Sequence, residues 1–145
     1  MIVGVGIDMV EVERMRRLIE RKGERALTRL FTEGEIAYAK THPEPERQLA
    51  ARVAAKEAAY KALSGNDLAK AIGWRELEVV SVRGHAPGLL LHGRASLRAA
   101  ELGVSRIHLS VTHTEHMAAA YVVAESLPET TGLPPSGNPD TFHRQ

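Results

Sequence analysis

The sequence predicts an α+β domain with helices packed on a mostly antiparallel sheet, and three observations carry that prediction. Residues 2–10 alternate in the manner of a strand. Residues 46–64 are rich in Ala, Leu, Glu, Lys and Arg, which is typical of a long helix. Residues 107–112 alternate again, and the apolar, β-branched segment 117–124 follows after a short turn. We expect the long helix to lie at the centre of the domain.

Length and composition indicate one globular domain. The 145 residues suffice for one hydrophobic core, and 43% hydrophobic with 26% charged residues is the usual balance of a soluble domain. We assign residues 1–125 to this domain. Residues 126–145 are rich in Pro, Gly, Ser and Thr and lack a pattern, so we expect a disordered tail without a catalytic role.

Several classes of protein are excluded by what the chain lacks. No apolar run approaches the roughly 18 residues that span a bilayer, and Asp8 interrupts the apolar N-terminal stretch, unlike a signal peptide. We therefore expect a cytoplasmic protein without a membrane partner. The chain has no cysteine, so disulfides, thiolate zinc sites and cysteine nucleophiles are excluded. A net charge of +1 gives no reason to expect a nucleic acid partner.

The first strand and helix place a carboxylate close to a basic surface. Asp8 shares one face of strand 2–10 with Gly4 and Gly6, which leave space beside the carboxylate for another group to approach. A helix over 12–22 follows and is stopped by a glycine. Its arginines fall close together at helical spacing, and they are Arg14, Arg17 and Arg21.

Polar residues break the apolar stripe of the long helix. Before it, residues 24–31 form a helical piece, and a capping box at 32–35 begins a short helix. Within helix 46–64, Lys56 lies in the apolar stripe, and Glu57 and Lys61 lie along its edge. Such breaks of the amphipathic pattern often mark a site.

The second half of the chain supplies the remaining strands. We expect, in order, a loop or short turn at 66–73, a strand at 77–82, a turn at 83–88, a strand at 89–92, a helix at 95–102, and the two closing strands.

Asp8 and Glu57 are the first candidate site. Two carboxylates from different elements are what Mg²⁺ needs, because this ion takes hard oxygen ligands and completes its shell with water and substrate phosphate. The alternative is structural: Asp8 would cap the following helix, and Glu57 would pair with Lys61 one turn away.

Lys56 and Lys61 are the second candidate. A lysine on a half-buried face favours an anion such as phosphate. Alternatively, its stem lies on the core while its ammonium reaches water. The basic face of helix 12–22 is either a solvated surface or a docking site for an acidic protein.

The histidines His108, His113 and His116 are the third candidate. Zinc usually needs tighter ligand spacing, and His108 and His113 should point in different directions. The pattern alone favours a structural histidine, and after that a phosphate-binding or acid–base histidine at the strand end.

Three motifs follow one another in a characteristic order. Residues 4–8 (GVGID) are followed by Arg14, residues 52–62 read RVAAKEAAYKA, and residues 110–114 read SVTHT before a closing apolar strand. In order, spacing and chain length they resemble the holo-[acyl-carrier-protein] synthase family, the short class of phosphopantetheinyl transferases. The likeness covers residues 1–125.

The resemblance implies an activity and a metal. The chain would transfer the 4'-phosphopantetheine arm of coenzyme A to a serine of apo acyl carrier protein, for fatty acid biosynthesis, and release adenosine 3',5'-bisphosphate. Asp8 and Glu57 would hold Mg²⁺ against the coenzyme A pyrophosphate, and Lys61 would stabilise charge on that phosphate. The serine proton could pass to Glu57, to His113 or to a water on the metal.

The resemblance also implies partners. His113 would lie near the phosphates of the coenzyme, and Arg14, with Arg21 on the same helix, would face the acidic carrier protein. A homotrimer is implied, with three active sites in the clefts between subunits. The turn at 84–87 is one residue longer than the family's G-x-P, so no role is assigned to His85.

Two other functions fit the same residues. A non-catalytic module would bind the carrier protein through the basic helix and keep the carboxylates for structure. A metal-dependent phosphohydrolase would use the same magnesium site with water as the nucleophile.

Overall fold

The structure, a computed structural model, describes residues 1–128 and is an α+β domain with antiparallel sheets, as the sequence predicts. Its elements, in chain order, are β1 (Ile2–Glu11), α1 (Val12–Lys22), α2 (Glu24–Leu30), α3 (Glu33–Lys40), α4 (Pro45–Ala62), α5 (Asp67–Lys70), the 3-10 helix η1 (Trp74–Glu76), β2 (Leu77–Val80), β3 (Gly88–Leu91), α6 (Gly93–Glu101), β4 (Arg106–His113) and β5 (Met117–Glu125).

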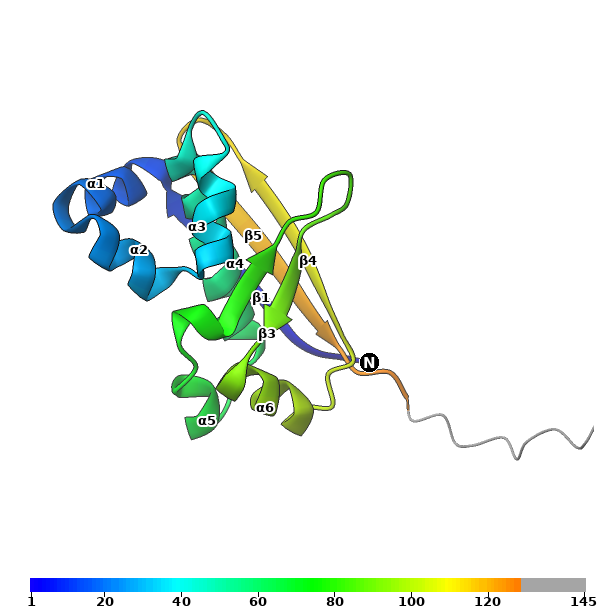
Figure 1. The fold of residues 1–145 in the computed structure, drawn as a ribbon. Coiled ribbons are helices and arrows are strands. Elements are labelled where there is room, and N and C mark those ends of the chain that lie inside the picture. Colours follow the sequence, from blue (N-terminus) through cyan, green and yellow to red (C-terminus); the bar gives the residue numbers. More distant parts are fainter. Residues whose placement is uncertain (129–145) are drawn as a thin grey trace, which may run out of the picture.

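The larger sheet has the strand order β1-β5-β4, and both of its pairings are antiparallel. Helix α4 runs along one face of this sheet, and α1, α2 and α3 gather at one end of the domain (Figure 1). The hairpin of β2 and β3 lies beside α4, and α5 and α6 lie at the other end (Figure 1). The long helix is therefore central, as expected from the sequence.

The glycines of β1 make room for a helix. A Cβ atom on Gly4 would lie 1.9 Å from the carbonyl oxygen of Ala62, and one on Gly6 would lie 1.8 Å from that of Ala58. The expectation that these glycines leave space for another group to approach is therefore confirmed, and the group that approaches is the backbone of α4. The close approach has its own consequence, since it brings the side chains of β1 and α4 together.

Helix α4 is buried on nearly all sides because the sheet covers one face and α1, α3 and the hairpin cover others. Alanines line much of the helix and allow these close contacts, and the residues around it form two hydrophobic clusters. Among the described residues, the buried charged side chains are Glu35, Arg52, Lys56 and Arg98.

Lys56 neither binds an anion from solution nor extends to water, so both interpretations of this residue are wrong. Its side chain is fully buried, and its Nζ donates to Glu35 Oε1 at 2.7 Å and to the carbonyl oxygen of Trp74 at 2.8 Å. Burial lowers the pKa of Lys56, although the Glu35 carboxylate opposes that shift. A pattern within one helix cannot reveal a partner that another helix supplies.

Several local predictions are confirmed and others are corrected. Thr32 and Glu35 form the predicted capping box at the start of α3. The segment 66–73, expected to be a loop or short turn, contains the four-residue helix α5, which Asn66 caps by accepting from Ala69 N at 2.9 Å. The predicted tail lies outside the described residues from 129 onward and stays a prediction. No helix in residues 1–128 is long and apolar enough to cross a membrane.

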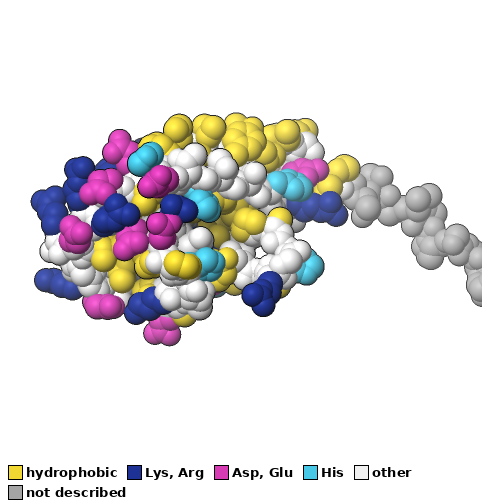
Figure 2. Space-filling view, turned by 90° about the horizontal axis from the view of Figure 1, so that it is seen from above, with side chains coloured by type: hydrophobic (Ala, Val, Ile, Leu, Met, Phe, Trp, Pro, Cys, Tyr) yellow, Lys and Arg dark blue, Asp and Glu magenta, His cyan; other side chains and the backbone are white. Residues whose placement is uncertain are grey.

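The outer face of the large sheet, away from α4, exposes apolar side chains. Those of Val5, Ile7 and Met9 on β1 are 51%, 60% and 62% exposed, and that of Tyr121 on β5 is 45% exposed. A band of hydrophobic side chains runs along one border of the molecule (Figure 2). We call the four residues the outer sheet patch.

Candidate functional site

The close contact of β1 with α4 assembles an acidic pair with a lysine. Asp8 points from β1 toward α4, where Glu57 and Lys61 lie one turn apart. Lys61 Nζ donates to Asp8 Oδ1 at 3.2 Å and to the carbonyl oxygen of Ile7 at 2.9 Å. The Asp8 side chain is only 15% exposed, whereas that of Lys61 is 53% exposed.

The structural alternatives for these carboxylates are wrong. The residue that precedes α1 is Glu11, and no side chain caps that helix, so Asp8 is not a helix cap. Within residues 1–128, Lys61 forms an ion pair with Asp8 and none with Glu57. The carboxylates therefore have no role as a cap or as a pair within one helix.

Neither Asp8 nor Glu57 has its negative charge fully stabilised by the protein. The Oδ2 atom of Asp8 is buried and has no hydrogen-bond donor. Burial raises the pKa of Glu57 to about 7, and the adjacent Asp8 carboxyl adds to the rise, while the charges of Lys61 and Arg14 oppose it. A buried oxygen without a donor, next to a destabilised carboxylate, is what a site for a hard cation presents.

Two hollows meet at Glu57. The first, which we call the α1 groove, has a volume of about 440 Å³ and is lined by Asp8, Glu57 and Trp74 together with Arg14, Arg17 and Arg21 of α1. The second, the Tyr60 cavity, has a volume of about 380 Å³. Besides Glu57 and Lys61, its walls include the apolar and aromatic side chains Tyr60, Ile72, Trp74 and Leu77.

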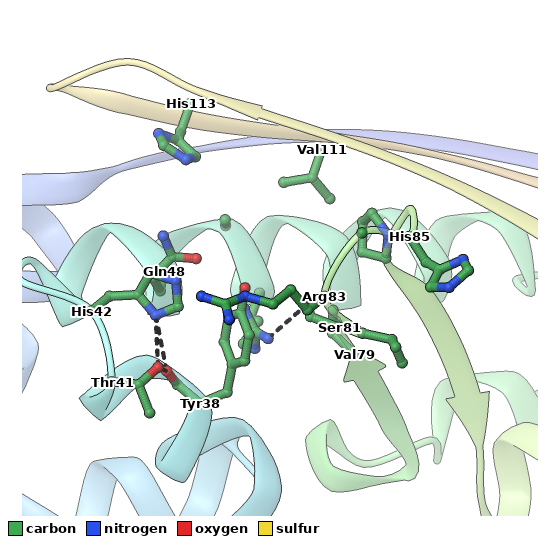
Figure 3. Close-up of a pocket in the computed structure, with 15 residues that line it drawn as sticks. Tyr38, Thr41, His42, Gln48, Val79, Ser81, Arg83, His85, Val111 and His113 are labelled. Atoms are coloured by element: carbon green, nitrogen blue, oxygen red, sulfur yellow. Dashed lines mark hydrogen bonds between the residues drawn. The ribbon is translucent and has the colours of Figure 1, made fainter.

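A third hollow lies between α4, the β2–β3 hairpin and β4, and we call it the hairpin cavity (Figure 3). It has a volume of about 710 Å³ and is lined by the basic or titratable side chains His42, Arg52, Arg83, His85 and His113. His113 points from β4 toward Gln48 and His42 (Figure 3). This concentration of cationic and donor groups suits an anion.

Arg52 is the residue of this cavity that sequence reasoning missed. It is 4% exposed, its guanidinium stacks 4.2 Å from the centre of the Tyr38 ring, and Nη2 donates to Ser81 Oγ at 3.1 Å. Its Nε has no acceptor. The motif placed Arg52 on the long helix, but only the folded hairpin shows that a cavity lies over it. His85, to which the sequence gave no role, also lines this cavity.

The structure separates His113 from the acidic pair. Gln48, Ala51 and Arg52 face the hairpin cavity, whereas Val53 and Glu57 face the α1 groove. At 100° per residue these two sets lie on opposite sides of α4. Within one protomer, the chain therefore brings together Asp8, Glu57, Lys61, Arg14 and Arg21, but not His113.

The histidines do not form a metal cluster. His108 pairs with Glu125 at 2.8 Å, His113 lines the hairpin cavity, and His116 lines a separate small hollow. Among residues 1–128, no group of three or more His, Asp or Glu side chains could hold a metal. The zinc interpretation of the histidines is therefore wrong. An ion at the acidic pair would have two carboxylate ligands from one chain, Asp8 and Glu57.

An acidic pair with a lysine, facing a basic groove, has the chemistry to hold a cation and a phosphate. The family model described as the 4'-phosphopantetheinyl transferase superfamily matches residues 4–124, and this chain belongs to that superfamily. The match agrees with the resemblance of the three motifs and covers all of them.

Two relatives and two solved structures carry the name holo-[acyl-carrier-protein] synthase. The chain is 44% identical to the holo-[acyl-carrier-protein] synthase of Solibacter usitatus over 87% of its length and 100% of the relative. It is 46% identical to that of Alkalilimnicola ehrlichii, over 87% and 98%. The structure of the Neisseria meningitidis synthase superposes with a TM-score of 0.76 at 30% identity, over 87% of this chain and 100% of that one. A Bacillus anthracis synthase in complex with CoA (3',5'-ADP) gives 0.68 at 32% identity, over 88% and 99%.

Proposed function

We propose that this protein transfers the 4'-phosphopantetheine arm of coenzyme A to a serine of apo acyl carrier protein and releases adenosine 3',5'-bisphosphate. The observation that carries the proposal is the cluster of Asp8, Glu57 and Lys61, which opens onto both the Tyr60 cavity and the α1 groove. The likeness to proteins named holo-[acyl-carrier-protein] synthase over nearly their whole length supports it.

Asp8 and Glu57 would hold Mg²⁺. The buried Oδ2 of Asp8 lacks a donor, and two carboxylates from one protomer are the usual protein share of this ion's oxygen shell. When bound, Mg²⁺ neutralises charge on the phosphate oxygens. Magnesium binding should be visible by calorimetry in the presence of adenosine 3',5'-bisphosphate, without turnover, and it should be lost in Asp8→Asn.

Lys61 would bind the pyrophosphate on the exposed side of the acidic pair. Its Nζ is already held by Asp8 and by the Ile7 carbonyl, so the ammonium is fixed in place before the substrate arrives. The serine oxygen attacks the phosphorus next to pantetheine, the bond to the bridging oxygen breaks, and the bisphosphate leaves. Charge that develops on the phosphate is stabilised by groups that need little reorganisation.

The two hollows at Glu57 suit the two substrates. The Tyr60 cavity is mainly apolar and would take the pantetheine arm next to the reacting phosphorus. The α1 groove carries Arg14, Arg17 and Arg21, which would dock an acidic carrier so that its serine reaches Glu57. Glu57 lines both hollows and would be one candidate acceptor for the serine proton. A water on the metal and His113 of a second protomer are the other candidates.

The hairpin cavity would hold the nucleotide, and this requires a second protomer. His113 and Arg52 are on the opposite side of α4 from Asp8 and Glu57, so one coenzyme A can contact both sets only where two chains meet. The outer sheet patch supports a homotrimer, because apolar area of this kind on a sheet favours association.

One assay tests the proposed function. The protein is mixed with apo carrier protein, coenzyme A and Mg²⁺, and the mass of the carrier is measured. The carrier should gain the mass of one phosphopantetheine. Binding of the carrier without a mass gain would instead indicate a docking module, and nucleotide cleavage without a change in the carrier would indicate a phosphohydrolase.

A further inference from the structure

A buried ion pair lies directly behind the candidate site. The side chains of Glu35 on α3 and Lys56 on α4 are both 0% exposed, and Nζ lies 2.7 Å from Oε1. Thr32 N donates to the same Oε1 at 2.9 Å, and Val79 N donates to Oε2 at 3.1 Å. The carboxylate is thereby bonded to three elements, namely the start of α3, helix α4 and strand β2.

The lysine also holds one loop carbonyl. Lys56 Nζ donates to the carbonyl oxygen of Trp74 at 2.8 Å, and the backbone N–H of Leu77 donates to the same oxygen as η1 ends. Trp74 is the residue at which the connection from α5 turns into η1. The backbone of Trp74 is therefore held by a buried side chain of the core. That side chain, Lys56, is the neighbour of Glu57 on α4.

Trp74 is a wall of both hollows at Glu57. It lines the α1 groove together with Leu30 and Val53, and it lines the Tyr60 cavity together with Ile72. The side chain is half-buried and packs against the hydrophobic cluster of α1, α2 and α3. A shift of this indole would change the shape of both hollows at once.

Stability alone does not explain the ion pair. Replacing a buried ion pair with apolar residues of similar volume is often neutral or stabilising, because desolvation of the two charges offsets their attraction. An apolar pair could fill the same space, but it could not accept from Thr32 N and Val79 N, as Glu35 does. Nor could it donate to the Trp74 carbonyl, as Lys56 does. Lys56 in particular holds the connection between α5 and η1 in a fixed position, through the Trp74 carbonyl.

We propose that Lys56, held by Glu35, is a positioning residue that fixes Trp74 as the shared wall of the Tyr60 cavity and the α1 groove, and so sets how the two substrates meet at Glu57. The inference rests on the proposed function for the identity of those substrates. Lys56 borders the Tyr60 cavity, but its side chain is 0% exposed, so it acts through Trp74.

The first test uses the wild-type protein. Trp74 is the one tryptophan of the 145 residues, so its fluorescence reports on this wall alone. Coenzyme A in EDTA, and separately a tryptophan-free apo carrier protein, should each give a saturable change in emission and reduce quenching by acrylamide. If either ligand binds, as measured by calorimetry, and leaves Trp74 unchanged, the shared wall is refuted.

The second test separates position from stability. Lys56→Met should shift the Trp74 emission to longer wavelength and raise the KM for both substrates about tenfold or more, since small misplacements at a site are costly. The double variant Glu35→Gln/Lys56→Met removes the unpaired buried charge and should recover Tm, but it still lacks a donor for the Trp74 carbonyl. Its emission and KM values should therefore stay altered.

Val122→Ala is the matched control, because Val122 is a 1% exposed core residue on β5 that lines none of the three hollows. At a similar loss of Tm it should keep wild-type KM values. Recovery of KM together with Tm in the double variant would overturn the positioning role. If the wild-type protein transfers no phosphopantetheine, the proposed function is refuted and not the positioning role. If Lys56→Met does not fold, the response of wild-type Trp74 fluorescence to the two ligands decides whether Trp74 is the shared wall.

Discussion

At the scale of single residues, the site depends on a carboxylate oxygen that the fold buries and leaves without a donor. Asp8 Oδ1 accepts from Lys61, but Oδ2 has no partner. An unsatisfied buried acceptor costs about 1–3 kcal/mol, so it calls for an explanation beyond folding. Glu57 adds a second cost, because burial and the adjacent Asp8 disfavour its charged form and raise its pKa to about 7. A bound cation would relieve both.

Removal of either negative charge should therefore lower activity strongly without loss of the fold. We expect Asp8→Asn and Glu57→Gln to lower kcat/KM by about 10²–10³-fold, the usual effect of removing one electrostatic contact to a reacting group. Their Tm values should stay near that of wild type or rise, since each change removes a desolvated carboxylate. The assay is phosphopantetheine transfer with thermal unfolding in parallel.

Glu115→Gln is the control for these variants, because Glu115 is an exposed carboxylate that lines neither hollow at Glu57. It should keep both kcat/KM and Tm. Wild-type turnover by Glu57→Gln would remove Glu57 from the proposed site.

At the scale of elements, the site exists because β1 and α4 touch backbone to backbone. A Cβ on Gly6 would lie 1.8 Å from the Ala58 carbonyl oxygen, and neither atom belongs to a flexible side chain. The strand and the helix therefore cannot separate slightly to accept a side chain without moving Asp8 away from Glu57.

Gly6→Ala should be severely destabilising. We expect a loss of roughly 3 kcal/mol or more in the free energy of unfolding, because the clash is with backbone in a packed core. Gly88→Ala is the matched control, since a Cβ atom added to Gly88 would meet no other atom within 4 Å and its φ is not positive. Denaturant unfolding measures both, and equal stability of the two variants would contradict the packing argument.

Sequence patterns predicted these elements well and their contacts less well. Periodicity and capping signals placed β1, α1 and the capping box of α3, because those depend on neighbours in the chain. The partner of Lys56 and the cavity over Arg52 depend on α3 and on the hairpin, which are far away in sequence. The motifs brought Asp8 and Glu57 to notice, but only the structure shows the unpartnered oxygen.

Helix α1 should determine affinity for the carrier. Arg14 and Arg21 are exposed, line the α1 groove and have no ion-pair partner within the described part of the chain, whereas Arg17 pairs with Glu13. We expect Arg14→Glu and Arg21→Glu to raise the KM for apo carrier about tenfold or more and to leave the KM for coenzyme A unchanged.

Arg25→Glu makes the same charge change on α2, at an exposed position outside the groove. It should have a much smaller effect, and added salt should reduce the difference between the variants. An unchanged carrier KM in Arg14→Glu would show that the carrier docks elsewhere.

At the scale of the whole molecule, the proposed trimer makes the two sides of α4 into two half-sites. The acidic pair and the hairpin cavity lie on opposite sides of α4, and the outer sheet patch leaves apolar side chains exposed. A homotrimer would bury such a patch and could join the half-sites of neighbouring chains. We expect Ile7→Glu and Tyr121→Asp to reduce the mass in light scattering from three chains to one and to remove activity. Leu97→Glu, at a 60% exposed position of α6, should do neither.

Shared sites predict that two inactive variants restore each other. Glu57→Gln lacks the acidic half-site and His113→Ala lacks the histidine of the other half-site, so each alone should transfer little phosphopantetheine. After subunits have exchanged in an equal mixture, about one interface in four would combine an intact Glu57 with an intact His113 from its neighbour. Activity should then recover to about a quarter of wild type. A mixture that stays as inactive as its components, although mixed trimers form, would show that each chain carries its whole site.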